Sequence, residues 1–142
     1  MGLIYHLTCK QCRYHTEIRE DPGMRLFVQT KELEDAIRSG KEPASEQIRT
    51  LLENGCSVNC VHPFLCPVCK TIETRDDPYI FKPVRVTPHG TVREYRVHYI
   101  YGIPKCGKCQ SELQFIPNAR SSKVRCPKCS GTLHVSDIGY YD

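Results

Sequence analysis

Eight of the ten cysteines occur as four C-x₂-C pairs, a spacing typical of turns that present two thiolates to one metal ion. The pairs are Cys9–Cys12, Cys66–Cys69, Cys106–Cys109 and Cys126–Cys129. Two such turns that face each other supply four sulfur atoms in a tetrahedral arrangement, which is the protein part of a structural Zn²⁺ site. Four turns therefore predict two zinc ions. Four thiolates also bind iron, so the sequence leaves the metal open.

Short segments with the alternation and β-branched residues of strands flank each pair. Residues 1–20 and 61–82 resemble two halves of one zinc ribbon, a small β-sheet module held by the metal. Closing the long loop between them adds a free-energy cost that grows only logarithmically with length. We therefore predict that the first two C-x₂-C pairs share one site. We predict that the last two pairs, which are separated by 16 residues, share the other.

Two further cysteines, Cys56 and Cys60, leave alternatives open. They can join Cys66 and Cys69 in a local cluster, which would leave the first pair without a partner. They can also form half of a third site with His62. Because Cys56-Ser-Val-Asn-Cys60 lacks the tight C-x₂-C turn, we favour an interpretation in which neither cysteine binds metal.

A helical insertion is predicted inside the first ribbon, over about residues 31–54. Thr30 is a suitable N-cap for a first helix that Gly40 would end. A second helix is expected from about Pro43 to Asn54, where apolar residues recur with helical spacing and Gly55 follows. We interpret the apolar stripes as a cover for one face of the ribbon, and the charged faces as solvated.

Residues 83–104 alternate around Pro88-His89-Gly90 and predict a β-hairpin. Tyr95, Tyr99 and Tyr101 fall on one face of its second strand, which we interpret as a packing surface rather than a platform for bases. The predicted fold is small, metal-stabilised and mainly β, with an inserted helical hairpin. Its three expected parts are an N-terminal ribbon over 1–82, a connector over 83–104 and a C-terminal ribbon over 105–142.

The formal net charge of +4 counts the thiols as neutral. Each Zn²⁺ bound by four thiolates has a net charge of −2, so two filled sites bring the protein close to neutral. Overall charge therefore gives no reason to expect nucleic acid. The exception is the turn that contains Arg120, Lys123 and Arg125, through which contact with nucleic acid is an alternative to a protein partner.

No signal-peptide pattern precedes the first cysteine pair, and no apolar run approaches the ~20 residues of a membrane helix. Paired C-x₂-C turns in such a chain favour metal over disulfide bonds in a reducing compartment. We therefore expect a cytoplasmic protein that binds metal and does not associate with membranes.

The four C-x₂-C pairs, the segments Ile37-Arg-Ser-Gly-Lys41 and Leu51-Leu-Glu-Asn-Gly55, and the ending Tyr140-Tyr-Asp142 together resemble a bacterial family of tandem zinc-ribbon proteins. The ribbons of that family are similar to rubredoxin, and the resemblance spans nearly the full length. It implies zinc binding by the eight paired cysteines and supplies no activity.

We weigh three functions. A non-enzymatic adaptor that binds a protein or nucleic acid is favoured, because sites with four thiolates are closed to substrate. A thiol-based redox or metal-linked sensor is the alternative, since C-x₂-C thiolates release metal when they are oxidised. A hydrolytic zinc enzyme needs an open coordination position and a general base, and the six scattered histidines form no such motif. We therefore predict that the protein is not an enzyme.

Overall fold

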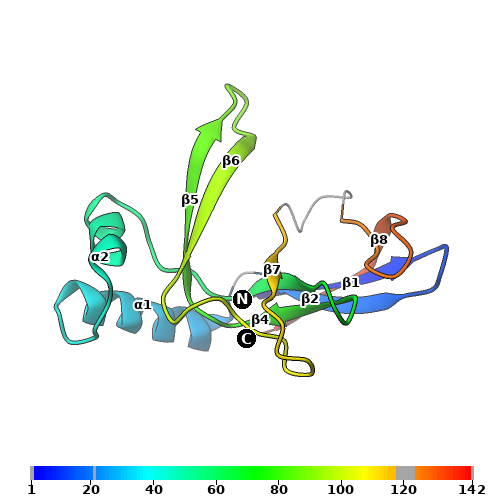
Figure 1. Ribbon diagram of the computed structural model, residues 1–142, viewed down its shortest axis with the longest axis horizontal. Coiled ribbons are helices and arrows are strands. Elements are labelled where there is room, and N and C mark those ends of the chain that lie inside the picture. Colours follow the sequence, from blue (N-terminus) through cyan, green and yellow to red (C-terminus); the bar gives the residue numbers. More distant parts are fainter. Residues whose placement is uncertain (1, 21, 118–123, 142) are drawn as a thin grey trace. The chain divides into compact units, whose positions relative to one another are not determined.

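A computed structural model describes residues 2–20, 22–117 and 124–141 (Figure 1). The chain divides into two compact units. Unit 1 contains residues 1–25, 61–76 and 103–142, and unit 2 contains 26–60 and 77–102. These units do not follow the expected boundaries, because the helical insertion and the hairpin connector belong together in unit 2. The described fold is mainly β with two helices.

Unit 1 is built from two three-stranded antiparallel sheets. The first has the order β2-β1-β8, with β2 at His15–Glu20, β1 at Gly2–Cys9 and β8 at Leu133–Tyr141. The second has the order β4-β3-β7, with β4 at Thr71–Arg75, β3 at His62–Cys66 and β7 at Gln114–Phe115. In both sheets the central strand pairs with its immediate successor and with a strand from the C-terminal third of the chain.

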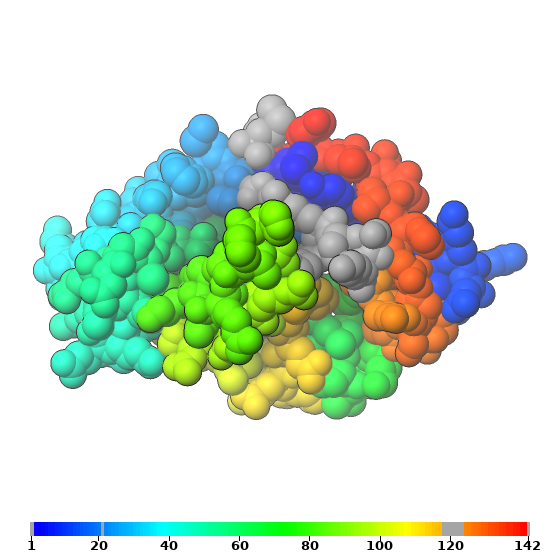
Figure 2. Space-filling model, turned by 90° about the horizontal axis from the view of Figure 1, so that it is seen from above, coloured from blue at the N-terminus to red at the C-terminus, as the bar shows by residue number. Residues whose placement is uncertain are grey.

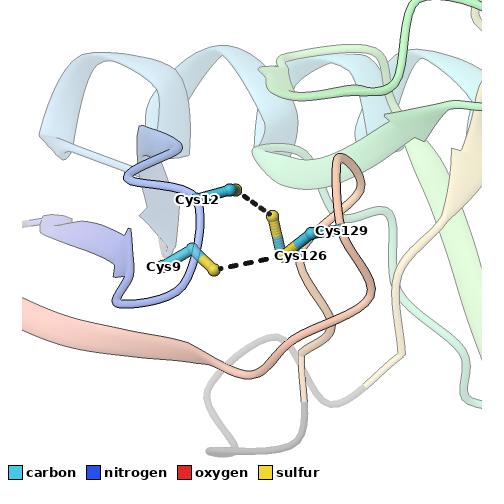
Figure 3. Close-up of side chains that lie close together, drawn as sticks. All are labelled: Cys9, Cys12, Cys126 and Cys129. Carbon is cyan, nitrogen blue, oxygen red and sulfur yellow. Dashed lines mark hydrogen bonds between the residues drawn. The ribbon is translucent and has the colours of Figure 1, made fainter.

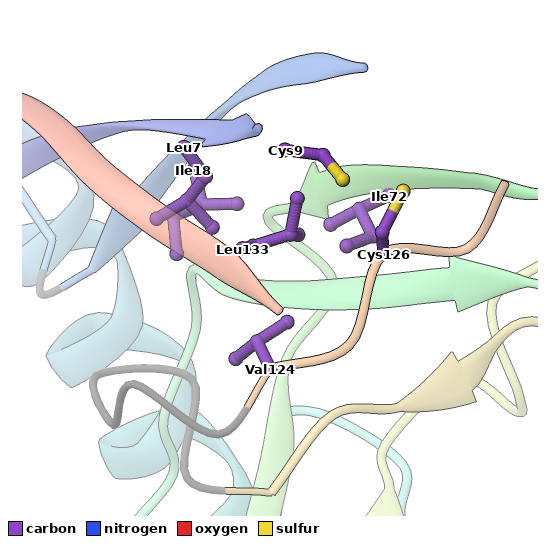
Figure 4. Close-up of a cluster of buried hydrophobic side chains, with 7 residues drawn as sticks. All are labelled: Leu7, Cys9, Ile18, Ile72, Val124, Cys126 and Leu133. Atoms are coloured by element: carbon purple, nitrogen blue, oxygen red, sulfur yellow. The ribbon is translucent and has the colours of Figure 1, made fainter. Parts of the chain in front are cut away.

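The core of unit 1 is shared by both sheets (Figure 4). Alternation along β1 places Leu7 and Cys9 on the buried face, opposite the solvated one. The second sheet contributes Ile72, whose backbone N–H donates to the Tyr14 hydroxyl over 3.0 Å. The seven buried members are Leu7, Cys9, Ile18, Ile72, Val124, Cys126 and Leu133. Because two of them are cysteines, sulfur atoms form part of this core.

Unit 2 combines α1 at Met24–Arg38, which lies in this unit from Leu26 onward, and α2 at Glu46–Glu53 with a hairpin of β5 at Tyr79–Val86 and β6 at Val92–Tyr99. Its core consists of aliphatic side chains from these elements and from the segment after α2. The buried members are Ile37, Ile48, Leu51, Leu52, Val58 and Ile80. The apolar stripes of the helices therefore pack in one cluster with Val58 and Ile80 of unit 2, and the prediction that they cover a ribbon face is wrong.

The two helices differ from their predicted bounds at their N-termini. Thr30 lies inside α1, where its hydroxyl donates to the Leu26 carbonyl over 2.7 Å, so it is not an N-cap. Ser45 is the N-cap of α2, because its side chain accepts a hydrogen bond from the Ile48 N–H. Among the described residues, neither helix is both long and apolar enough to span a bilayer.

The predicted hairpin is present, and its first strand begins at Tyr79 instead of residue 83. Gly90 has a φ of 85° in the connecting turn, a conformation that glycine adopts without a steric penalty. On one face of the hairpin, Tyr95 stacks against Phe81 with ring centroids 5.3 Å apart. Tyr101 is exposed and donates its hydroxyl hydrogen to Glu42 over 3.0 Å.

Candidate metal centres

The structure brings the eight paired cysteines into two groups of four sulfur atoms that can each hold a metal ion. Within each group, all four sulfur atoms lie within 4.8 Å of one another. Site A consists of Cys9, Cys12, Cys126 and Cys129, and site B consists of Cys66, Cys69, Cys106 and Cys109. The predicted pairing of the C-x₂-C turns is therefore wrong. The first turn faces the fourth, and the second faces the third.

Strand pairing explains this nested arrangement. β8 pairs with β1 in a register that sets Leu133 opposite Cys9, which brings the fourth turn against the first. β7 pairs with β3 through Phe64 and Phe115, which brings the third turn against the second. Proximity along the chain supported the other pairing, but it says nothing about which strands share a sheet.

The cost of loop closure is too small for proximity along the chain to decide which turns pair. The sulfur atoms of Cys12 and Cys126 are separated by 114 positions, whereas Cys109 and Cys126 are separated by 17. The longer loop costs only about 2 kcal/mol more to close. Complete burial of one leucine contributes about 1.5–3 kcal/mol. Pairing of β1 with β8 buries Leu133, whose side chain is 2% exposed. The burial of this one side chain therefore offsets the extra free energy of closing the longer loop.

All four C-x₂-C turns share one backbone conformation. The residue after the second cysteine has a positive φ in each turn, between 57° and 66°. Its backbone N–H donates to the carbonyl of the first cysteine over 2.9–3.0 Å. These residues are Arg13, Lys70, Gln110 and Ser130. A left-handed residue at this point closes the turn, and both sulfur atoms of each turn belong to the same group of four.

Backbone N–H groups also point at the sulfur atoms. The Cys69 N–H donates to the Cys66 sulfur over 3.3 Å, and the Lys128 N–H donates to the Cys126 sulfur over 3.4 Å. Such bonds stabilise a thiolate, which is the form that binds metal. The turns therefore provide the ligands and the hydrogen bonds around them.

The spacing of the sulfur atoms fits a tetrahedral metal. In site A, the sulfur of Cys9 lies 3.5 Å from that of Cys129, and the sulfur of Cys12 lies 3.5 Å from that of Cys126 (Figure 3). The corresponding distances in site B are 3.5 Å and 3.9 Å. Four sulfur atoms bound to Zn²⁺ at about 2.3 Å are separated by about 3.8 Å. A disulfide would require about 2.05 Å, and all ten cysteines are free thiols.

Each site has a buried and an exposed side. The first cysteine of every turn is at most 2% exposed: Cys9, Cys66, Cys106 and Cys126. The second cysteine is exposed in three of the turns and half-buried in the remaining one, at Cys69. The chain therefore holds each site at the edge of its core, with one side towards solvent.

The thiols of one site differ in acidity. In site B, hydrogen bonds with the side chain and backbone of Ser111 lower the pKa of Cys109 to about 6. The hydrogen bond with Cys109, together with burial, raises the pKa of Cys69 to about 12. In site A, a backbone hydrogen bond from Cys12 lowers the pKa of Cys9 to about 7. The first thiolate of a site therefore forms readily, whereas a bound cation is needed to stabilise the last.

The remaining predicted candidates make other contacts. The Cys60 sulfur lies 2.9 Å from the Thr30 hydroxyl, and Cys56 packs against the core of unit 2. His62 stacks on Phe115 with ring centroids 3.7 Å apart, and its Nε2 lies 2.8 Å from the Ile116 carbonyl oxygen. None of the three belongs to a metal-binding group of the described residues.

The predicted basic turn is only partly described. Arg120 and Lys123 lie outside the described residues, whereas Arg125 is exposed and donates to the Ser130 carbonyl over 3.2 Å. The C-x₂-C turns have several exposed cations close to the sulfur groups: Lys10, Arg13, Lys70, Lys108 and Lys128.

Comparisons with family models, with curated proteins and with solved structures give no match. The resemblance to tandem zinc-ribbon proteins therefore stays a prediction. The function of the chain has to be inferred from its own geometry.

Proposed function

We propose that the protein binds two structural Zn²⁺ ions, one in each four-cysteine site, and is a non-enzymatic module that binds a protein partner. The observation that carries the proposal is the presence of four sulfur atoms within 4.8 Å in each of two sites. An all-sulfur donor set fits zinc, which takes four thiolates in structural sites and keeps no position open for substrate. When bound, the metal would supply cross-links between segments distant in sequence.

The exposed cations on the turns can be explained without a nucleic-acid partner. A Zn²⁺ ion with four thiolates has a net charge of −2, which nearby lysines and arginines offset. Lys128 lies between the two sites, since it follows Cys126 of site A and its Nζ donates to the carbonyl of Cys69 in site B over 3.1 Å. A structural role therefore accounts for these charges before contact with phosphate is invoked.

β8 supports a protein partner. It is at the edge of its sheet and exposes three apolar side chains, Val135, Ile138 and Tyr140, which are 49%, 53% and 68% exposed. An exposed edge strand with apolar side chains is a surface to which a partner can add an extended segment. We expect Ile138→Asp to abolish capture of such a partner while the zinc content stays unchanged.

The direct test of the metal assignment is native mass spectrometry combined with elemental analysis of protein purified under reducing conditions. We expect two zinc ions per chain, with each Zn²⁺ taking the place of two protons in the mass at a given charge state. Cys56→Ser should keep both ions, whereas Cys109→Ser should lose one. A folded protein without metal, or with iron in both sites, would contradict the zinc assignment.

The solvent-facing cysteines favour a second candidate function, a peroxide sensor. Cys12, Cys109 and Cys129 are exposed, so an oxidant can reach at least one cysteine of each site. Hydrogen peroxide would oxidise two thiolates to a disulfide, be reduced to water, and release the metal. Metal that stays bound under mild peroxide would exclude this candidate and leave the structural role.

A further inference from the structure

Unit 2 contains a groove whose lining includes none of the eight paired cysteines. The groove has a volume of about 630 Å³ and is lined on one side by α2 and on the other by the β5–β6 hairpin. Figure 2 shows the surfaces of these two elements, α2 in cyan-green and the hairpin in green, as neighbours. The volume is within the range of ~300–1,000 Å³ that small-molecule sites occupy.

The hairpin side of the groove is basic. Lys82 and Arg96 both line it, and they are direct cross-strand partners in the antiparallel register. The next pair along the same face sets His98, which also lines the groove, opposite the buried Ile80. Like charges that face each other across two strands destabilise the pair. The sequence therefore keeps an arrangement that opposes the stability of the hairpin.

The two cations have no ion-pair partner among the described residues, although the Glu46 carboxylate lines the opposite wall. Neither Lys82 nor Arg96 forms an ion pair within that part of the chain. Elsewhere in the same hairpin a cation does have a partner, because Arg85 forms an ion pair with Glu94 over 3.1 Å. Two unpaired cations side by side in a groove form a positive field that an anion can enter.

The opposite wall has a different chemistry. Glu46 and Thr50 of α2 and Asn54, its C-cap, line this wall: the Glu46 carboxylate accepts hydrogen bonds, and the side chains of Thr50 and Asn54 accept and donate them. Leu51, Pro83 and Val84 add apolar surface beside these groups. A ligand that matches both walls carries an anionic group at one end and hydroxyl or amide groups on an organic body.

We propose that this groove binds a small phosphate-bearing ligand of up to nucleotide size, with Lys82 and Arg96 holding the phosphate. Phosphate fits because its several oxygen atoms accept hydrogen bonds from two cations at once. The polar side chains of α2 face the organic part of the ligand. The proposal does not depend on the zinc sites, because every residue that lines the groove belongs to unit 2.

The test is isothermal titration of the full-length, metal-loaded chain with pyrophosphate, AMP, ATP, adenosine and a single-stranded RNA oligonucleotide. We expect at least one of the three phosphate probes to bind and adenosine not to bind. Arg96→Glu should weaken that binding by about tenfold or more, as expected for the loss of a charged hydrogen bond. This variant also places opposite charges at Lys82 and position 96, so its melting temperature should be unchanged or higher.

Arg93→Glu is the matched control, because Arg93 is exposed on the same strand and does not line the groove. It makes the same charge change and should leave the affinity unchanged. Three outcomes would overturn the proposal: no phosphate probe binds at millimolar concentration, only the RNA oligonucleotide binds, or both variants weaken binding equally. The first would show an empty groove, the second a surface for polynucleotides and the third an effect of net charge alone.

Discussion

The two units differ in the residue types that adopt left-handed backbone. In unit 2 every described residue with a positive φ is a glycine: Gly40, Gly55, Gly90 and Gly102. In unit 1 every described residue with a positive φ has a side chain: Arg13, Val61, Lys70, Gln110 and Ser130. Left-handed backbone costs about 1–2 kcal/mol at such a residue, whereas glycine adopts it freely.

This difference shows what stabilises each unit. Four of the five strained residues in unit 1 directly follow a C-x₂-C pair. A structural zinc site contributes about 10–16 kcal/mol, so metal binding can hold these turns without glycine. The described part of unit 2 has no four-cysteine group and depends on an aliphatic core and on suitable turn residues. Unit 1 should therefore tolerate poor local propensity, and unit 2 should not.

Removal of metal should have the largest effect, and it should be confined to unit 1. Without metal, unit 1 retains a small core that includes two cysteines, whereas the core of unit 2 is unchanged. We expect a strong chelator under reducing conditions to collapse the amide NMR signals of unit 1, including β1 and β8. Signals of α2 and the hairpin should persist. Loss of both sets together would mean that the units fold as one.

Leucine truncations should separate core packing from metal binding. Leu133→Ala and Leu52→Ala each remove a side chain that is 2% exposed and should each cost about 2–5 kcal/mol of unfolding free energy. Only Leu133→Ala should also weaken metal affinity, because Leu133 packs in the cluster that contains Cys9 and Cys126. Urea denaturation and competition with a chelator measure the two effects.

The exposed neighbours Val135 and Glu53 provide matched controls for these truncations. Alanine at either position should change stability by no more than about 0.5 kcal/mol. Weaker metal binding in Leu52→Ala would contradict this difference between the units, since it would show that the core of unit 2 also affects the sulfur sites.

The half-buried imidazole of His62 in unit 1 should stay neutral to an unusually low pH. Burial lowers the pKa of His62 to about 4, whereas the Ile116 carbonyl partly opposes the shift. Because the folded pKa lies below the unfolded value of 6.5, the neutral ring stabilises the fold fully above pH 6.5. That contribution, about 3 kcal/mol at most, is lost as the pH falls from 6.5 to 4.

NMR titration of the His62 ring measures this pKa directly. We expect no change in its ring-proton shifts between pH 8 and pH 5.5, a range above the lowered pKa of about 4. A midpoint near the unfolded value would show that the ring is solvated and that the stack on Phe115 is not formed.

Glycine exchanges should have the smallest effect and opposite signs in the two units. Gln110→Gly should raise the stability of unit 1 by about 1 kcal/mol, because it removes left-handed strain. Gly90→Ala should lower the stability of unit 2 by about 1 kcal/mol or more. A Cβ atom at Gly90 meets nothing within 4 Å, so this loss would be conformational and not steric. Thermal denaturation of the metal-loaded variants measures both changes.

The matched control for the first exchange is Lys108→Gly, which lies in the same turn without a positive φ. It should gain no stability. An equal gain in both variants would indicate that charge or side-chain entropy, and not backbone strain, is responsible.

Local features of this fold could be predicted from the sequence. Alternating residues around His89-Gly90 indicated the hairpin, and helical spacing indicated α2. The start of α1 was missed because Met24 to Thr30 begin without a capping signal, and Thr30 was interpreted as the cap. Local patterns locate an element well where a turn or cap residue marks its end.

The pairing of the four turns could not be predicted, because it depends on contacts between distant strands. Each of the four turns offers two equivalent cysteine sulfurs, so the sequence does not show which two turns share a metal site. The register that sets Cys9 opposite Leu133 decides the pairing, and the separation along the chain affects it by only about 2 kcal/mol. The sequence therefore indicated the turns but not the sites.

Replacement of zinc by ¹¹³Cd tests the nested arrangement most directly, because cadmium–proton correlation spectra connect each ion to the β-protons of its own ligands. We predict that one ion correlates with Cys9, Cys12, Cys126 and Cys129, and the other with Cys66, Cys69, Cys106 and Cys109. A single ion that correlates with both Cys9 and Cys66 would contradict the arrangement.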